Sequence, residues 1–172
     1  MTTKDLNSEE YNVYYQRYID KVSDAVDLSE GFSIGKNKVL EFFNAIPEEN
    51  WKSKYKSDKW TIKEVLQHLT DTERIFAYRV FRIARDDKTP LSSFDQNTYV
   101  RPSKANQKSK AILIKEYEAV RESTIALINS LSHDDLCTIG VSSDVPMSAR
   151  AAAFIIIGHE IWHMDIVKER YL

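Results

Sequence analysis

Three residues near the end of the chain have the types and spacing of a metal site. His159, Glu160 and His163 form the string HEIWH. On a helix, this spacing places two imidazoles one turn apart on the same face, where they can hold Zn²⁺, while the glutamate acts as general base toward a metal-bound water. The same string occurs in zinc proteases, whose chemistry also needs a third ligand.

The zinc protease pattern does not continue after this string. Those enzymes place the third ligand downstream, as a histidine at H-x-x-G-x-x-H spacing or as a more distant glutamate. Only MDIVKERYL follows His163, so we expect the third ligand to come from upstream. His133 follows a predicted helix cap and is most simply a solvated loop residue. His68 is therefore the candidate third ligand.

The surroundings of the histidine pair favour a metal over ordinary burial. Ala152, Ile156, His159, His163 and Ile166 form one helical stripe, so both imidazoles are expected in the core. A single core histidine is usually satisfied by a hydrogen bond, and that interpretation stays open for each of the two. A shared cation would satisfy both at once, which makes it the preferred hypothesis.

Helices are expected to supply the scaffold for these residues. The chain has only four Gly and four Pro in 172 residues and few alternating β-branched runs, which predicts an all-α fold. The best-marked helix begins with the capping box Thr61 to Glu64. The expected helices span about 8–22, 30–45, 61–86, 108–131 and 148–172, with one short turn at 132–136.

A long connection separates the helices expected at 61–86 and 108–131. About 20 residues are more than antiparallel neighbours need. A helix of about 26 residues is roughly 39 Å long, a path that about 20 extended residues can retrace. The connection is therefore predicted to be a crossover, with these two helices parallel and 148–172 antiparallel to both. That topology brings His68 within about one helical turn of the level of His159 and His163.

Composition excludes several classes of partner. With 24 Lys and Arg against 26 Asp and Glu, the net charge is −2. No basic footprint for nucleic acid or anionic lipid is present, and the longest apolar run, residues 151–157, is too short to span a membrane. The single Cys137 excludes a disulfide framework. We expect a single cytoplasmic domain over residues 1–172, with no nucleic-acid or membrane partner.

An aromatic stripe marks the first expected helix. Tyr11, Tyr14, Tyr15 and Tyr18 recur at helical spacing. They can pack on the body of the protein or on a second copy of the chain. Packing on the body is preferred, and a homodimer stays open.

Three blocks of the sequence carry a family resemblance: KWTIKEVLQHLTDTERIFAYRVFRIARDDKTPL, FDQNTYV and GHEIWHMDIVKERYL. Together they resemble the DinB/YfiT-like superfamily of metal-dependent enzymes. The resemblance implies a four-helix bundle with a long crossover between its second and third helices, plus an N-terminal helix. It also implies one divalent metal ion, zinc or nickel, held by His68, His159 and His163 with water in the open positions. Glu160 is then expected mainly at the rim or surface.

Three functions remain compatible with such a site. Three neutral imidazoles leave a metal its full charge and an open position, which suits attack of activated water on an amide or ester of a small molecule. This hydrolase is the leading hypothesis. Transfer of a small thiol bound as thiolate is the first alternative, and non-catalytic binding of metal or a small ligand is the second.

Several further residues are candidates around the metal. Asp71 and Glu160 are candidate catalytic groups, and Thr72 can reach the same helix face as His68. The second half of the crossover is expected to approach the metal, which makes four of its residues candidates for substrate binding, with plain packing as the alternative: Asp95, Gln96, Tyr99 and Arg101. Arg79, Arg82 and Arg85 are expected to form structural ion pairs, and Trp162 is expected in the core.

Overall fold

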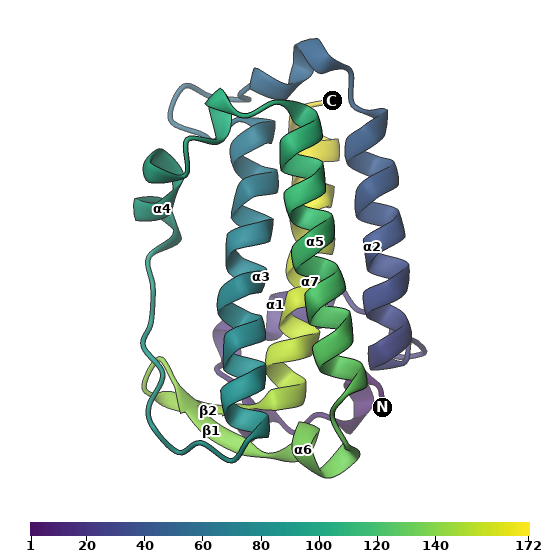
Figure 1. The fold of residues 1–172 in the computed structure, drawn as a ribbon, viewed down its shortest axis with the longest axis vertical. Helices are drawn as coiled ribbons and strands as arrows, with labels where there is room; N and C mark the ends of the chain where they lie inside the picture. The colour runs from purple at the N-terminus through teal and green to yellow at the C-terminus, as the bar shows by residue number, and fades with distance from the viewer.

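Four long helices form the body of the protein in a computed structural model that describes residues 1–172 (Figure 1). They are α2 (Leu28–Ala45), α3 (Ile62–Ala84), α5 (Lys110–Asn129) and α7 (Ala149–Arg170). Helices α3 and α5 run in the same direction, and α2 and α7 run in the opposite direction. The predicted four-helix bundle with parallel α3 and α5 is confirmed.

Side-chain caps set where these helices begin. Asp27, Thr61, Ser109 and Ser148 each accept a hydrogen bond from a backbone N–H of the first turn of α2, α3, α5 and α7, respectively. Such bonds satisfy backbone donors that have no partner inside a helix. At Thr61 the bond is reciprocal, because Glu64 accepts from the Thr61 N–H at 2.8 Å. The predicted capping box is therefore present.

The core consists of two apolar clusters stacked along the bundle. One contains Phe76 and Val80 of α3 with residues 152–157 of α7, and the other contains Val65 and Leu66 of α3 with Val167 of α7. His159 and His163 lie between these two parts of α7. The histidines therefore occupy a polar layer between two apolar ones.

The connection between α3 and α5 runs back along the bundle, as a crossover must (Figure 1). It contains an unpredicted helix, α4 (Gln96–Ser103), which Asp95 caps through a bond from the Asn97 N–H at 2.9 Å. No residue of α4 is buried. Because it buries no apolar face, its sequence lacks the periodicity that marks a helix.

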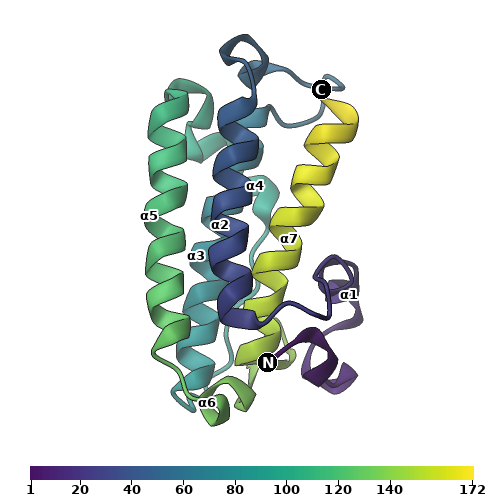
Figure 2. The same ribbon diagram turned by 90° about the vertical axis from the view of Figure 1, so that its right-hand side faces the viewer.

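The prediction of one continuous N-terminal helix over residues 8–22 is wrong, because only residues 16–19 of it are α-helical. The segment forms three 3₁₀ turns (Thr3–Asp5, Ser8–Glu10 and Val13–Tyr15) and one short helix, α1 (Gln16–Ile19). The side chains of Asn7 and Asn12 cap two of the turns, and such local bonds compete with a continuous helix. The segment packs beside the first half of α7 (Figure 2).

The linker before α7 holds a small antiparallel hairpin that was not predicted. The short turn expected at 132–136 is α6 (His133–Cys137), followed by β1 (Ile139–Ser142) and β2 (Val145–Ser148). Ser143 and Asp144 have φ of 55° and 64° at the two central positions of the hairpin turn, where a tight turn needs the left-handed conformation. None of the helices is long and apolar enough to cross a membrane.

Candidate metal centre

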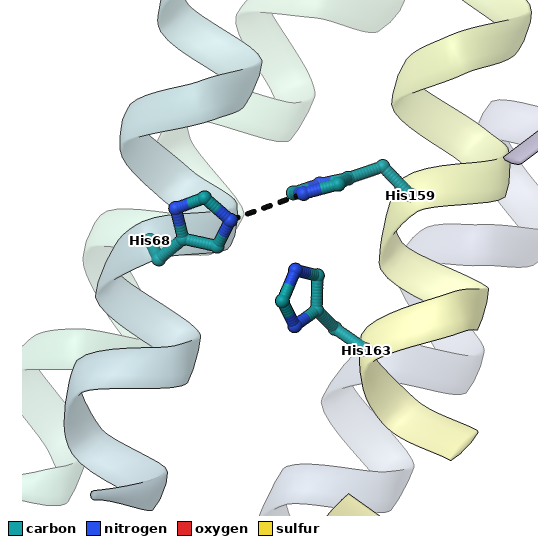
Figure 3. A group of neighbouring side chains, drawn as sticks. All are labelled: His68, His159 and His163. Atoms are coloured by element: carbon teal, nitrogen blue, oxygen red, sulfur yellow. Dashed lines mark hydrogen bonds between the residues drawn. The ribbon is translucent and has the colours of Figure 1, made fainter. Parts of the chain in front are cut away.

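His68 of α3 meets His159 and His163 of α7 between the two helices (Figure 3). The Nε2 atoms of His68 and His159 are 3.0 Å apart. One ring nitrogen of each of the three histidines lies within 4.8 Å of the others. The structure thus brings together the three histidines that the sequence singled out.

The fold explains why residues 91 positions apart meet. His159 and His163 are one turn apart on α7, so their side chains share a face. Because α7 runs antiparallel to α3, the C-terminal half of α7 lies beside the N-terminal half of α3, which carries His68. The crossover permits this pairing. It lets α5 run parallel to α3, and α7, which follows α5 after α6 and the hairpin, then runs antiparallel to both.

Burial keeps these imidazoles neutral. It lowers the pKa of His68 to about 4 and, together with the neighbouring rings, lowers the pKa of His159 and His163 well below the usual value. At neutral pH each ring therefore has one nitrogen lone pair free to bind a cation. Two Nε2 atoms 3.0 Å apart need a proton or a cation between them, because two lone pairs repel.

The donor set fits a first-row divalent metal. Zinc binds histidine nitrogen at about 2.0–2.1 Å, which places tetrahedral ligands roughly 3.3 Å apart. In the structure one pair of ring nitrogens is 3.0 Å apart and no pair is more than 4.8 Å apart. Rotations of the side chains that move each nitrogen by about 1 Å would bring all three to the tetrahedral separation. Three neutral imidazoles are a common ligand set for zinc and nickel.

Thr72 supports His68 from the next turn of α3. Its Oγ1 lies 3.3 Å from His68 Nδ1. A ring that binds metal through Nε2 carries its proton on Nδ1 and donates it to a nearby oxygen. Asp71 does not accept a hydrogen bond from His68. Its carboxylate instead accepts hydrogen bonds from Gln67 at 3.0 Å and from Arg74 at 2.9 Å. Of Asp71 and Thr72, only Thr72 therefore lies within hydrogen-bond distance of His68.

The prediction that Glu160 lies at the rim or surface is wrong. The side chain is 2% exposed and accepts hydrogen bonds from Arg121 Nη2 at 2.6 Å and Tyr117 Oη at 3.0 Å. Arg121 also donates to Glu73 through two nitrogens at 2.8 Å. A rotation of about 100° from His159 turns Glu160 toward α5 instead of toward the histidines. Glu160 thus belongs to a buried ion-pair network with Arg121 and Glu73.

A cavity of about 550 Å³ opens beside the histidines. Its walls come from the N-terminal segment, α3, the crossover and α7, and aromatic rings supply much of the surface. Trp162 packs against the apolar core, as predicted, and its ring also lines this cavity. It is only partly buried and meets Tyr18 and His163 edge to face. Trp60, which the sequence did not single out, lies 4.7 Å from His68 between ring centroids.

Only one of the four crossover candidates reaches this cavity. Gln96 lines it, together with Phe94 and Asn97. Asp95 is used as the α4 cap, and Tyr99 is 44% exposed and packs against Phe94. Arg101 is exposed. Gln96 and Tyr99 are one turn apart on the same face of α4, and both line a separate small pocket beside His68 and Thr72. Arg101 lines neither pocket.

The three arginines predicted to form ion pairs along and just after α3 differ in their partners. Arg82 pairs with Asp87, as predicted. Arg85 is exposed, has no carboxylate partner and lies over the ring of Phe81. Arg79 is 2% exposed, lines the cavity and also has no carboxylate partner. The predicted ion pair is therefore wrong for both Arg85 and Arg79.

Comparison with known proteins agrees with the fold. YfiT from Bacillus subtilis, described as a probable metal-dependent hydrolase with an unusual four-helix bundle topology, is similar in structure with a TM-score of 0.73. The sequences are 13% identical, and the match covers 87% of this chain and 90% of YfiT. No curated protein matches the sequence. The model of the DinB superfamily matches residues 32–167, so the chain belongs to the DinB superfamily.

Proposed function

We propose that the protein is a metal-dependent hydrolase that acts on a small molecule. His68, His159 and His163 would hold one divalent ion, zinc or nickel. The observation that carries this proposal is the approach of two imidazole Nε2 atoms to 3.0 Å at the wall of a 550 Å³ cavity. A proton shared between His68 and His159 would satisfy only those two nitrogens, whereas a shared cation would satisfy all three rings at once.

A divalent metal bound by three neutral imidazoles supplies Lewis acidity and lowers the pKa of a bound water toward neutrality. The chain's own residues prepare the site for it. Burial keeps the three rings deprotonated, and Thr72 fixes the ring of His68.

The cavity lacks a dedicated carboxylate base, which favours thiol transfer as a second candidate. Asp58 is the only acidic residue of the lining, and it is exposed and pairs with Lys59 at 2.8 Å. A thiol ionises near pH 8.5, far more readily than water, and therefore needs less help from a base. A small thiol activated at the metal is thus compatible with the same residues.

Turnover by metal-loaded protein tests the proposal. Purified protein loaded with zinc or with nickel is assayed on panels of small esters and amides, and with small thiols plus an electrophile. We expect hydrolysis that chelation abolishes, that His163→Ala removes and that His133→Ala, at an exposed histidine outside the site, leaves unchanged. Turnover of thiols alone would favour the second candidate. Bound metal without any turnover would favour a binding protein and contradict both.

A further inference from the structure

Arg79 lies on the same face of α3 as His68, deep in the cavity wall. The two residues are eleven positions apart, which is about three helical turns and roughly 16 Å along the axis. The Arg79 side chain is 2% exposed and lines the cavity. A buried arginine and the three histidines therefore line the same cavity.

The guanidinium of Arg79 has donors without acceptors. Its Nη2 donates to the Ser92 carbonyl oxygen at 3.0 Å and to Ser143 Oγ at 3.2 Å. The buried Nε and Nη1 atoms make no hydrogen bond. Burial lowers the pKa of Arg79, and the Tyr15 hydroxyl, the one further side chain that acts on the guanidinium, opposes that effect. The Phe76 ring lies 4.7 Å from Cζ. An arginine stays charged in proteins, so this is a buried cation with unused N–H groups.

Arg121 shows how the same fold treats a cation that serves structure. It is fully buried as well, yet all three of its nitrogens donate to oxygen atoms, including the carboxylates of Glu73 and Glu160. The protein thus supplies two carboxylates to one buried arginine and none to the other. Since an unpaired buried charge is costly, the missing partner of Arg79 is expected to come from outside the protein.

The other charged residues of the cavity lining also favour an anionic ligand. Arg17 is exposed at the lining, has no carboxylate within ion-pair distance, and lies 4.0 Å from the Tyr14 ring centroid. The one acidic lining residue, Asp58, is neutralised by Lys59. The lining therefore carries excess positive charge before any metal is counted, and it complements an anion.

We propose that Arg79 binds the oxyanion, a carboxylate or a phosphate, of an elongated small molecule whose other end reaches the histidines. The oxyanion takes the hydrogen bonds of Nε and Nη1 when the guanidinium turns toward the cavity. Charge-assisted hydrogen bonds of this kind are the stronger ones in proteins. That the far end is the reacting one rests on the proposed function, whereas anion binding at Arg79 does not.

Paired anionic and neutral probes test this assignment. N-benzoylglycine is compared with its neutral amide, N-benzoylglycinamide, and phenyl phosphate with phenol, by calorimetric titration. Protein treated with a chelator and protein loaded with zinc are both used, so a failed hydrolase assay leaves this test intact. The variants are Arg79→Met, Arg79→Gln and, as the control, Arg85→Met at the exposed residue that caps the C-terminal end of the same helix.

We expect at least one anion to bind about ten- to a hundredfold more tightly than its neutral partner. Arg79→Met and Arg79→Gln should abolish that preference, and Arg85→Met should keep it. The anion that shows the preference identifies the oxyanion. Binding of neither pair, equal binding of anion and neutral partner, or an undiminished preference in Arg79→Met would overturn the proposal.

Thermal unfolding separates this role from a structural one. Replacing an unpaired buried cation with an apolar side chain is often neutral or stabilising. Arg79→Met should therefore melt at or above the wild-type temperature while losing the anion preference. A large fall in melting temperature, like that expected when Arg121 is replaced, would instead make Arg79 a structural residue and overturn its assignment to a ligand.

Discussion

Replacing Glu160 tests whether HEIWH works as it does in a zinc protease. In the structure its carboxylate faces Arg121 and Tyr117, and burial raises its pKa although Arg121 opposes the shift. Glu160→Gln keeps the shape and one carbonyl acceptor but loses a charge-assisted hydrogen bond. We therefore expect a loss of about 1–2 kcal/mol in the free energy of unfolding, with metal binding intact.

The expected loss of stability is modest because Arg121 keeps one of its two carboxylate partners. After Glu160→Gln, Arg121 keeps the carboxylate of Glu73, with two bonds of 2.8 Å, so no buried charge is left alone. Arg121→Met instead leaves both carboxylates without their cation and should cost about 3–5 kcal/mol. At about 2–4 °C per kcal/mol, the melting temperature should fall by roughly 2–8 °C for Glu160→Gln and further for Arg121→Met.

Urea unfolding and metal-dependent turnover, measured on the same samples, decide the question. Glu122→Gln on α5 is the control, because Glu122 is exposed and its pair with Lys36 is a surface pair of small energetic value. A Glu160→Gln variant with unchanged stability and a more than hundredfold slower metal-dependent reaction would refute the structural role and restore the glutamate as general base.

Three further outcomes are expected. Thr72→Val should weaken zinc binding about tenfold, measured by competition with a chelator, because His68 Nδ1 loses its oxygen partner. The free energy of unfolding of metal-free protein should rise between pH 4 and 6.5, about 3 kcal/mol of it through His68, since the unfolded chain binds the extra proton there. In urea titrations His68→Asn should reduce that rise without removing the part due to His159 and His163, and an unchanged slope would contradict it. Gly158→Ala should destabilise the protein by about 1–3 kcal/mol and expose the N-terminal segment to limited proteolysis, because a Cβ would lie 1.9 Å from the Tyr18 carbonyl oxygen.

The bundle was predictable because its helices bury apolar faces. The helix expected at 61–86 is α3, and its capping box and apolar spacing mark it in the sequence. The length of the following connection was enough to predict the crossover and hence the antiparallel approach of α7. Helix α4 and the N-terminal turns were not predictable in this way. They are held by local caps such as Asp95 and Asn12 instead of a periodic apolar stripe.

The histidine cluster was predictable for a related reason. Two ligands share one turn of α7, and helix lengths place His68 at nearly the same level. The partners of Glu160 and Arg79 depend on which side chains face them across the bundle. Arg121 lies 39 positions from Glu160 on another helix, and no spacing rule connects them. That no carboxylate lies beside Arg79 likewise follows only from packing.

Metal content measured by elemental analysis tests the central claim most directly. Wild-type protein is purified without a histidine tag, supplied with zinc or nickel, dialysed and compared with His68→Ala, His163→Ala and the control His133→Ala. The three-histidine centre predicts about one ion per chain in the wild type and in His133→Ala, and loss of that ion in the other two variants. A wild type that takes up no metal, or a His68→Ala variant that keeps it fully, would contradict the account.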